Sequence, residues 1–123
     1  MKYARVFADS QGESHFEDIE VLLTLVEFAP PAPPLLLSAF TPARQTAFLV
    51  APVGWFGDWH PVPQRQWFFF LTGELEVAVS DGGRRRFTAG SVVLFEDIEG
   101  RGHTSQNVGE EEVVPMIAQL SDE

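Results

Sequence analysis

One stretch decides the fold, and it reads WHPVPQRQWFFFLTGELEV from residue 59 to residue 77. Its apolar run at residues 67–71 ends at Thr72-Gly73, a turn signal, and a second strand-like run follows. In that second run apolar and mainly polar positions alternate: Leu75, Val77 and Val79 against Glu74, Glu76 and Ala78. A period of two predicts a β-strand with one buried face and one solvated face.

The same pattern continues outward along the chain. Asp81-Gly82-Gly83 predicts a tight hairpin turn, because these residue types tolerate the positive φ that such turns require. Further short apolar runs bounded by turn signals predict strands at residues 46–51, 84–87, 91–95, 104–107 and 113–120. Many short strands with no sustained helical period are typical of an all-β sandwich or barrel.

The amino-terminal third gives weaker signals. Residues 21–28 are apolar and predict the first strand, and the acidic stretch at residues 13–20 leaves a short helix open. Four prolines within residues 30–34 cannot donate to a sheet ladder, so we expect a strap that wraps the surface. At 123 residues the chain predicts one domain, 1–123, with residues 1–45 forming the amino-terminal strands and strap and residues 46–123 forming the barrel.

Composition excludes several classes of function. A formal net charge of -10 disfavours nucleic acid as a partner, and 45% hydrophobic residues are enough for a sizeable core. The absence of cysteine excludes disulfides, zinc–thiolate sites and thiol nucleophiles, and it suits a cytoplasmic location. Residues 1–10 lack the apolar core of a signal peptide, and no apolar run reaches bilayer length, so we expect no membrane partner.

Two of the three histidines, His60 and His103, lie at strand ends beside loops rich in glycine or proline. Strand ends from distant parts of a sequence meet at the mouth of a barrel, so these two rings are expected to converge on a pocket. His15 is expected to be an ordinary surface or hydrogen-bonded residue. The sequence singles out no catalytic residue, since Ser105 follows no nucleophile elbow.

The stretch at residues 59–77 resembles the first cupin motif, which runs His-x-His, three or four residues, Glu, six residues, Gly. The stretch GSVVLFEDIEGRGHTSQN, residues 90–107, resembles the second cupin motif, whose final His-x-x-x-Asn matches His103 and Asn107. The resemblance implies a double-stranded β-helix, the jelly roll of a small single-domain cupin-type barrel. It also implies that His60, Gln66 and His103 lie on facing inner walls of that barrel.

The first motif is degenerate. Gln66 stands where the family usually has a glutamate ligand, and Val62 stands where it has a second histidine. Imidazole binds Zn, Fe, Ni and Mn well, whereas an amide oxygen is a weaker, uncharged ligand. The resemblance therefore leaves two alternatives, a divalent metal ion held by His60, Gln66 and His103, or a pocket without a cofactor. The candidates for a fourth ligand are Asp97, Glu96, Asp58 and His15.

Aromatic residues predict the walls of the pocket. Phe68 and Phe70 share parity with Gln66 and should face inward with it, and Trp59 and Asp97 are further candidates for ligand contact. The residues of opposite parity, Trp67, Phe69 and Leu71, then form an outer apolar face. Such a face predicts a homodimer packed through sheet faces or edges.

Two functions from different classes follow. In the first, the protein binds a small molecule in an aromatic-walled pocket centred on His60, Gln66 and His103, and no chemistry is required. In the second, it is a metal-dependent cupin enzyme, an isomerase or dioxygenase acting on a small polar organic molecule. The residues do not decide whether the protein is an enzyme.

Overall fold

The computed structural model describes residues 1–121, and every regular element in that range is a β-strand. The all-β prediction is therefore confirmed. The predicted domain, 1–123, ends with residues 122 and 123, which lie outside the described residues. Within residues 1–121 no helix is long and apolar enough to cross a membrane.

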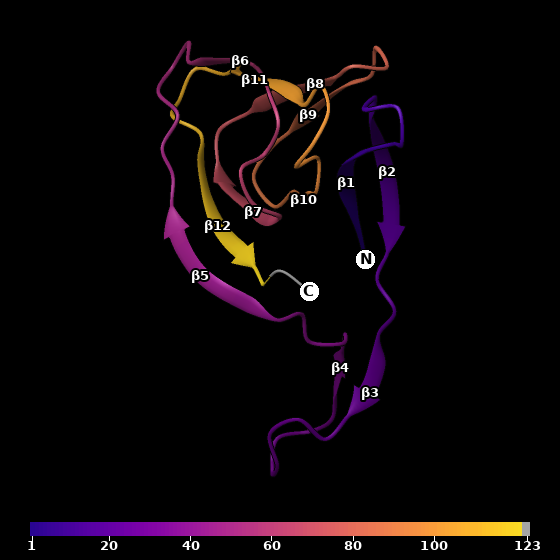
Figure 1. The fold of residues 1–123 in the computed structure, drawn as a ribbon. Coiled ribbons are helices and arrows are strands. Elements are labelled where there is room, and N and C mark those ends of the chain that lie inside the picture. Colours follow the sequence, from indigo (N-terminus) through magenta and orange to yellow (C-terminus); the bar gives the residue numbers. More distant parts are fainter. Residues whose placement is uncertain (122–123) are drawn as a thin grey trace.

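The larger of two facing sheets has six strands in the order β2-β1-β10-β7-β12-β5. Its pairs are antiparallel except for β1 with β10, which is parallel. In Figure 1 this sheet curves from β5 at the left to β2 at the right. Its strands are β1 (Lys2–Ala8), β2 (Ser14–Glu20), β5 (Ala43–Phe48), β7 (Gln66–Thr72), β10 (Val92–Phe95) and β12 (Val114–Leu120).

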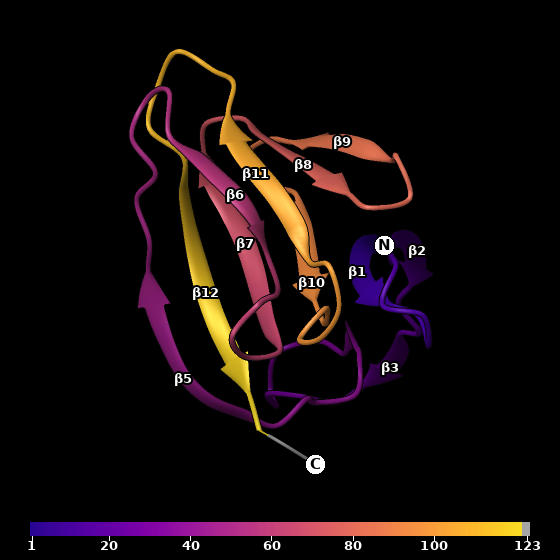
Figure 2. The same cartoon turned by 45° about the horizontal axis from the view of Figure 1, so that its top comes forward.

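The smaller sheet has four strands in the order β6-β11-β8-β9, and Figure 2 shows it lying across the larger one. Its strands are β6 (Phe56–His60), β8 (Leu75–Val79), β9 (Arg84–Phe87) and β11 (His103–Asn107). The predicted inner face of β8 is confirmed, since Leu75, Val77 and Val79 are buried in the core, but Ala78, which was expected on the solvated face, is buried as well. That core fills the space between the sheets with side chains such as Val6, Val93 and Phe70.

The amino-terminal third differs from the sequence prediction. Residues 14–20 form β2 rather than a helix, because β1 pairs with them along the whole strand, from Lys2 opposite Glu20 to Ala8 opposite Ser14. The first strand of the chain is therefore β1, not residues 21–28, of which only β3 (Thr24–Val26) is a strand.

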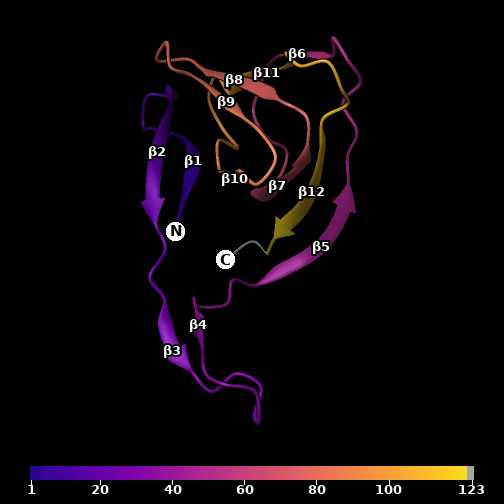
Figure 3. The ribbon, with the colours of Figure 1, turned by 180° about the vertical axis from the view of Figure 1, so that it is seen from behind.

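The proline-rich segment also differs from the prediction, because it does not strap the surface. It connects β3 to β4 (Leu35–Leu37), and the two short strands pair with each other only. Figures 1 and 3 show this β3–β4 arm projecting away from both sheets, with the prolines at its far end. Proline cannot donate to a ladder, so the chain leaves the strand there and reverses.

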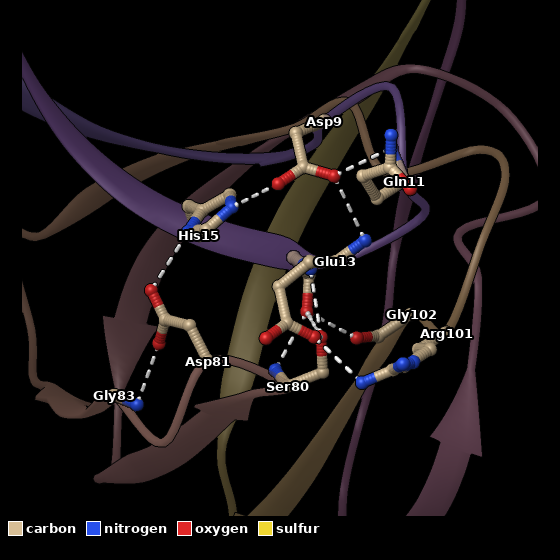
Figure 4. A network of polar contacts seen from close by, with 10 residues as sticks. Asp9, Gln11, Glu13, His15, Ser80, Asp81, Gly83, Arg101 and Gly102 are labelled. Atoms are coloured by element: carbon tan, nitrogen blue, oxygen red, sulfur yellow. Dashed lines mark hydrogen bonds and ion pairs between the residues drawn. The ribbon is translucent and has the colours of Figure 1, made fainter.

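A polar network joins the β1–β2 hairpin to the turn between β8 and β9 (Figure 4). His15 lies between two carboxylates, with Nε2 2.7 Å from Asp9 Oδ2 and Nδ1 2.8 Å from Asp81 Oδ2. The hydrogen bonds from Asp9 and then Asp81 raise the pKa of His15. The bond to His15 lowers the pKa of Asp9, and the Gly83 amide together with His15 lowers that of Asp81.

We expect this network to be strongest between about pH 4 and pH 6.5. Because the pKa of His15 is raised in the folded protein, His15 stabilises the fold fully at pH values below the ordinary histidine pKa. This stabilisation is lost as the pH rises through the pKa of His15 in the folded protein. Because the pKa values of Asp9 and Asp81 are lowered in the folded protein, both residues stabilise the fold at pH values above the ordinary aspartate pKa. This stabilisation is lost as the pH falls through their pKa values in the folded protein.

Urea unfolding at pH 6 and pH 8 checks this prediction, with His15→Gln as the comparison. The wild-type protein should lose more stability between the two pH values than the variant does, because only the wild type releases the His15 proton. An equal loss in both proteins would show that His15 does not carry the effect.

Candidate functional site

The two histidines expected to share a pocket lie directly opposite each other. Strands β6 and β11 are antiparallel neighbours, and His103 is the pairing partner of His60. Their ring centroids are 4.9 Å apart, with an angle of 53° between the ring planes. Sheet pairing thus places side by side two imidazoles that come from distant parts of the sequence.

Gly102 makes this close approach possible. Its φ is +73°, and a Cβ at this position would collide with the backbone carbonyl of His60 and with the nitrogen of Pro61. Only glycine lacks that atom and adopts this conformation freely. The chain can therefore enter β11 in contact with the end of β6, and this contact fixes the position of His103, the first residue of β11.

A cavity of about 270 Å³ lies beside the two rings. Its size suits a small molecule, slightly below the range of drug-sized ligands. Four polar side chains line it, from His60, Gln66, His103 and Ser105. The rest of the lining is apolar and consists of Leu49, Val50, Ala51, Trp55, Val62, Pro63, Phe68, Leu75, Phe95, Val113 and Pro115.

His103 is held by a buried carboxylate. Its Nδ1 lies 2.6 Å from Asp97 Oδ2, and the two side chains are 7% and 0% exposed. A carboxylate accepts hydrogen bonds, so Nδ1 of His103 carries the proton and donates a hydrogen bond to Asp97. Asp97 is fixed in turn because its backbone carbonyl accepts the amide of Val62 at 3.0 Å. Its other oxygen, Oδ1, is buried with no hydrogen-bond partner among residues 1–121.

His60 is held in a similar way by the backbone. Its Nδ1 lies 2.6 Å from the carbonyl oxygen of Asp58, which can only accept. Nδ1 therefore donates, and in the neutral ring Nε2 keeps its lone pair. Across the described chain, no hydrogen bond reaches the Nε2 of either histidine.

Gln66 is buried in β7, where its side chain is committed to the neighbouring strand. Its Oε1 accepts a hydrogen bond from Gln119 Nε2 at 3.0 Å. The amide oxygen that would ligate a metal is thus already occupied by a strand neighbour. Val62, which stands where the cupin motif has its second histidine, contributes an apolar wall to the cavity.

These residues do not fit a divalent metal ion. Among residues 1–121 no group of three or more histidine, aspartate or glutamate side chains could hold one. Two imidazole nitrogens without a carboxylate fall short of the three or four ligands of known metal centres.

The candidate fourth ligands lie in other contacts. Glu96 is held by Arg5 and Arg65, with Arg5 Nε 2.5 Å and Arg65 Nη2 2.6 Å from its oxygens. Burial alone would raise the pKa of Glu96, but these two guanidinium groups outweigh it and hold the pKa below its usual range. His15 belongs to the network of Figure 4, and the Asp58 carboxylate accepts the amide of Trp59.

The structure separates the four residues expected to contact a ligand. Phe68 lines the cavity, whereas Phe70 is buried in the core and stacks on Phe87 with centroids 5.9 Å apart. Trp59 is half exposed and lies outside the lining. Asp97 lies outside the lining too, where it hydrogen-bonds His103.

Sequence reasoning missed several lining residues. Ser105 could have been found, because it lies two positions after His103 and so on the same face of β11. Phe95 packs against His103 with ring centroids 4.8 Å apart, and this contact depends on how the two sheets face each other, which the sequence does not give. Leu49 and Val50 reach the cavity from the segment that follows β5.

Comparison with known proteins identifies the class of fold. The cupin domain of Cnp3 from Schizosaccharomyces pombe is similar, with a TM-score of 0.53, 15% identity, and coverage of 98% of this chain and 84% of that one. A cupin 2 conserved barrel domain protein from Leptotrichia buccalis has a TM-score of 0.48 and 14% identity, and the match spans 83% of this chain and 41% of that one. The sequence matches no family model and has no significant match among curated proteins.

The chain therefore has the cupin fold, which confirms the jelly-roll prediction made from residues 59–77 and 90–107. At this level of identity the likeness extends to the fold alone.

Gly102→Ala tests how the two histidines are brought together. We expect it to destabilise the protein by at least about 1 kcal/mol more than Gly82→Ala, because a Cβ at residue 102 is both strained and overpacked. Gly82 is the matched control, since its φ is +96° and nothing lies within 4 Å of its added Cβ. Chemical denaturation of both variants measures the difference, and equal losses would contradict the role of the close approach.

Proposed function

We propose that this protein binds a small, largely apolar molecule in the cavity beside His60, Gln66 and His103. The observation that carries the proposal is the lining itself: apolar walls with a few polar groups whose remaining atoms have no partner in the described chain. That composition is typical of small-molecule sites. Phe68 and Phe95 supply aromatic faces against which an apolar body can pack.

The burial of polar groups supports the same proposal. His103, Ser105 and Gln66 are each less than a tenth exposed and line the cavity, so a bound molecule would meet polar atoms that bulk water reaches only in part. A ligand with its own polar atom would supply the partner that Nε2 of His103 lacks. The metal-dependent isomerase or dioxygenase expected as the alternative has no such support, because its ligand set is incomplete.

We also propose that the protein works as a homodimer. The accessible surface is 7489 Å², whereas a compact monomer of 13.7 kDa exposes roughly 6,600 Å². The excess of about 900 Å² is close to the area, about 800 Å² per partner, that a standard interface buries.

Exposed apolar side chains lie on two parts of the chain that a second copy would cover. The β3–β4 arm exposes Leu25, Leu35 and Leu36, and a two-stranded arm of this length needs something to pack against. Strand β5 is an unpaired edge, and Phe48 at its end is 71% exposed. In a dimer the β3–β4 arm of one copy would pack against strand β5 of the other copy. The two contacts would be related by symmetry, and each would bury the exposed apolar side chains of both parts.

Ser105→Leu tests the binding proposal. The larger side chain fills the cavity, so affinity for phenol or toluene should fall at least about tenfold while the fold is retained. Thr104→Leu is the matched control, because residue 104 faces the opposite side of β11 and does not line the cavity. Ligand-observed NMR measures both affinities. The proposal fails if neither probe binds the wild-type protein up to its solubility limit, or if Ser105→Leu binds as well as the wild type.

Light scattering after size-exclusion chromatography tests the dimer. The wild-type protein should elute with twice the chain mass of 13.7 kDa, and Leu36→Asp should shift it towards one chain mass, because a charge cannot be buried unpaired. Ile98→Asp is the control, at an exposed apolar residue outside the arm and edge. A wild-type protein of one chain mass at micromolar concentration would contradict the dimer.

A further inference from the structure

We infer that the cavity selects neutral ligands that donate a hydrogen bond, a hydroxyl group on an apolar body, and that Asp97 sets this preference by fixing the tautomer of His103. The inference rests on the proposed binding function and names the chemical class of its ligand.

The hydrogen bonds of the two imidazoles determine which ring nitrogen carries the proton. Asp97 and the Asp58 carbonyl each accept from an Nδ1, so both neutral imidazoles carry their proton on the side away from Nε2. The Nε2 atom of each ring can therefore accept a hydrogen bond from a ligand but cannot donate one. The ring centroids are 4.9 Å apart and both residues line the cavity, so a ligand in the cavity lies beside both rings.

The buried negative charge of Asp97 affects which ligands the cavity can hold. The Asp97 carboxylate is fully buried and has one oxygen without a partner, so negative potential lies behind His103. An anionic ligand head would meet two acceptors backed by a buried negative charge, which disfavours carboxylates and phosphates.

A cationic head is also disfavoured. Asp97 does not line the cavity, and no other carboxylate lines it within the described residues, so an ammonium group would lose its water without a direct ionic partner. A neutral O–H group avoids both costs, since it donates to an imidazole nitrogen and carries no charge into the apolar walls. The Gln66 amide and the Ser105 hydroxyl also line the cavity and can donate to the oxygen of such a ligand.

The experiment compares phenol, benzoate and benzylammonium, three probes with one ring and different heads, at pH 8 in the presence of a metal chelator. Phenol should bind the wild-type protein at least about tenfold more tightly than either ion. In Asp97→Asn the obligatory acceptor is gone, and the amide can donate to Nδ1 and move the proton to Nε2. Phenol affinity should then fall about tenfold and benzoate affinity should rise.

Glu99→Gln is the matched control, because it removes the same charge from the same loop at an exposed side chain for which no ion pair or hydrogen bond is found. It should leave the order of the three probes unchanged. Nitrogen-15 NMR of the wild-type histidines gives a second readout that does not need the variant to fold. The pattern should be that of a protonated Nδ1 and an unprotonated Nε2 at His103.

The outcomes separate this inference from the binding proposal. If none of the three probes binds the wild type, the binding function itself fails. If the probes bind without preference for phenol, or if Asp97→Asn keeps that preference, the inference is overturned while the binding function stands. A protonated Nε2 at wild-type His103, or a preference that needs added Zn²⁺, would overturn it as well.

Discussion

The contact on which the site depends is one of backbone against backbone. Strand β11 enters the smaller sheet at Gly102, and that residue lies so close to the His60 carbonyl that no side chain fits between them. This approach places His103 opposite His60, and the alternation of side chains along a strand puts Ser105 on the same face of β11. The polar part of the cavity follows from it.

The loop from Glu96 to Gly102 does the rest of the positioning. Glu96 is held by two arginines. Asp97 accepts the Val62 amide with its carbonyl and the His103 Nδ1–H with its carboxylate, and the Arg101 amide donates to the carbonyl of Gly12 in the amino-terminal hairpin. The loop thus connects both sheets to one imidazole. Polar groups on such a support keep their orientation, which a binding site for a small molecule requires. The incomplete first motif and the buried aspartate behind His103 favour the proposed binding through hydrogen bonds over coordination of a metal.

Local patterns in the sequence were enough for the fold and for part of the site. The alternation in β8, the turn at residues 81–83 and the two cupin-like stretches predicted an all-β jelly roll. The inward parity of Phe68 and Phe70 agrees with their packing, since Phe70 is buried in the core and the partly buried Phe68 packs against it. Strand β2 could not be predicted, because its acidic residues favour a helix or a loop until β1 pairs with them. The β3–β4 arm was missed for a related reason, since its strands are three residues long and are defined only by each other.

The roles of Asp97 and Phe95 could not be predicted for a different reason. Asp97 was expected to contact the ligand, yet it acts on His103 from outside the cavity, and only the path of the loop decides between the two. Phe95 packs against the same ring from a strand in the other sheet, and the distance between sheets is a tertiary property that no local pattern encodes.

The pairing of His60 with His103 is tested most directly by nuclear Overhauser effects between their ring protons in the protein in solution. With ring centroids 4.9 Å apart, a cross-peak between the two imidazoles is expected in the absence of any ligand or metal. If assigned spectra show both rings with contacts to other residues and none to each other, the paired-histidine cavity does not exist, and the description of the site is wrong.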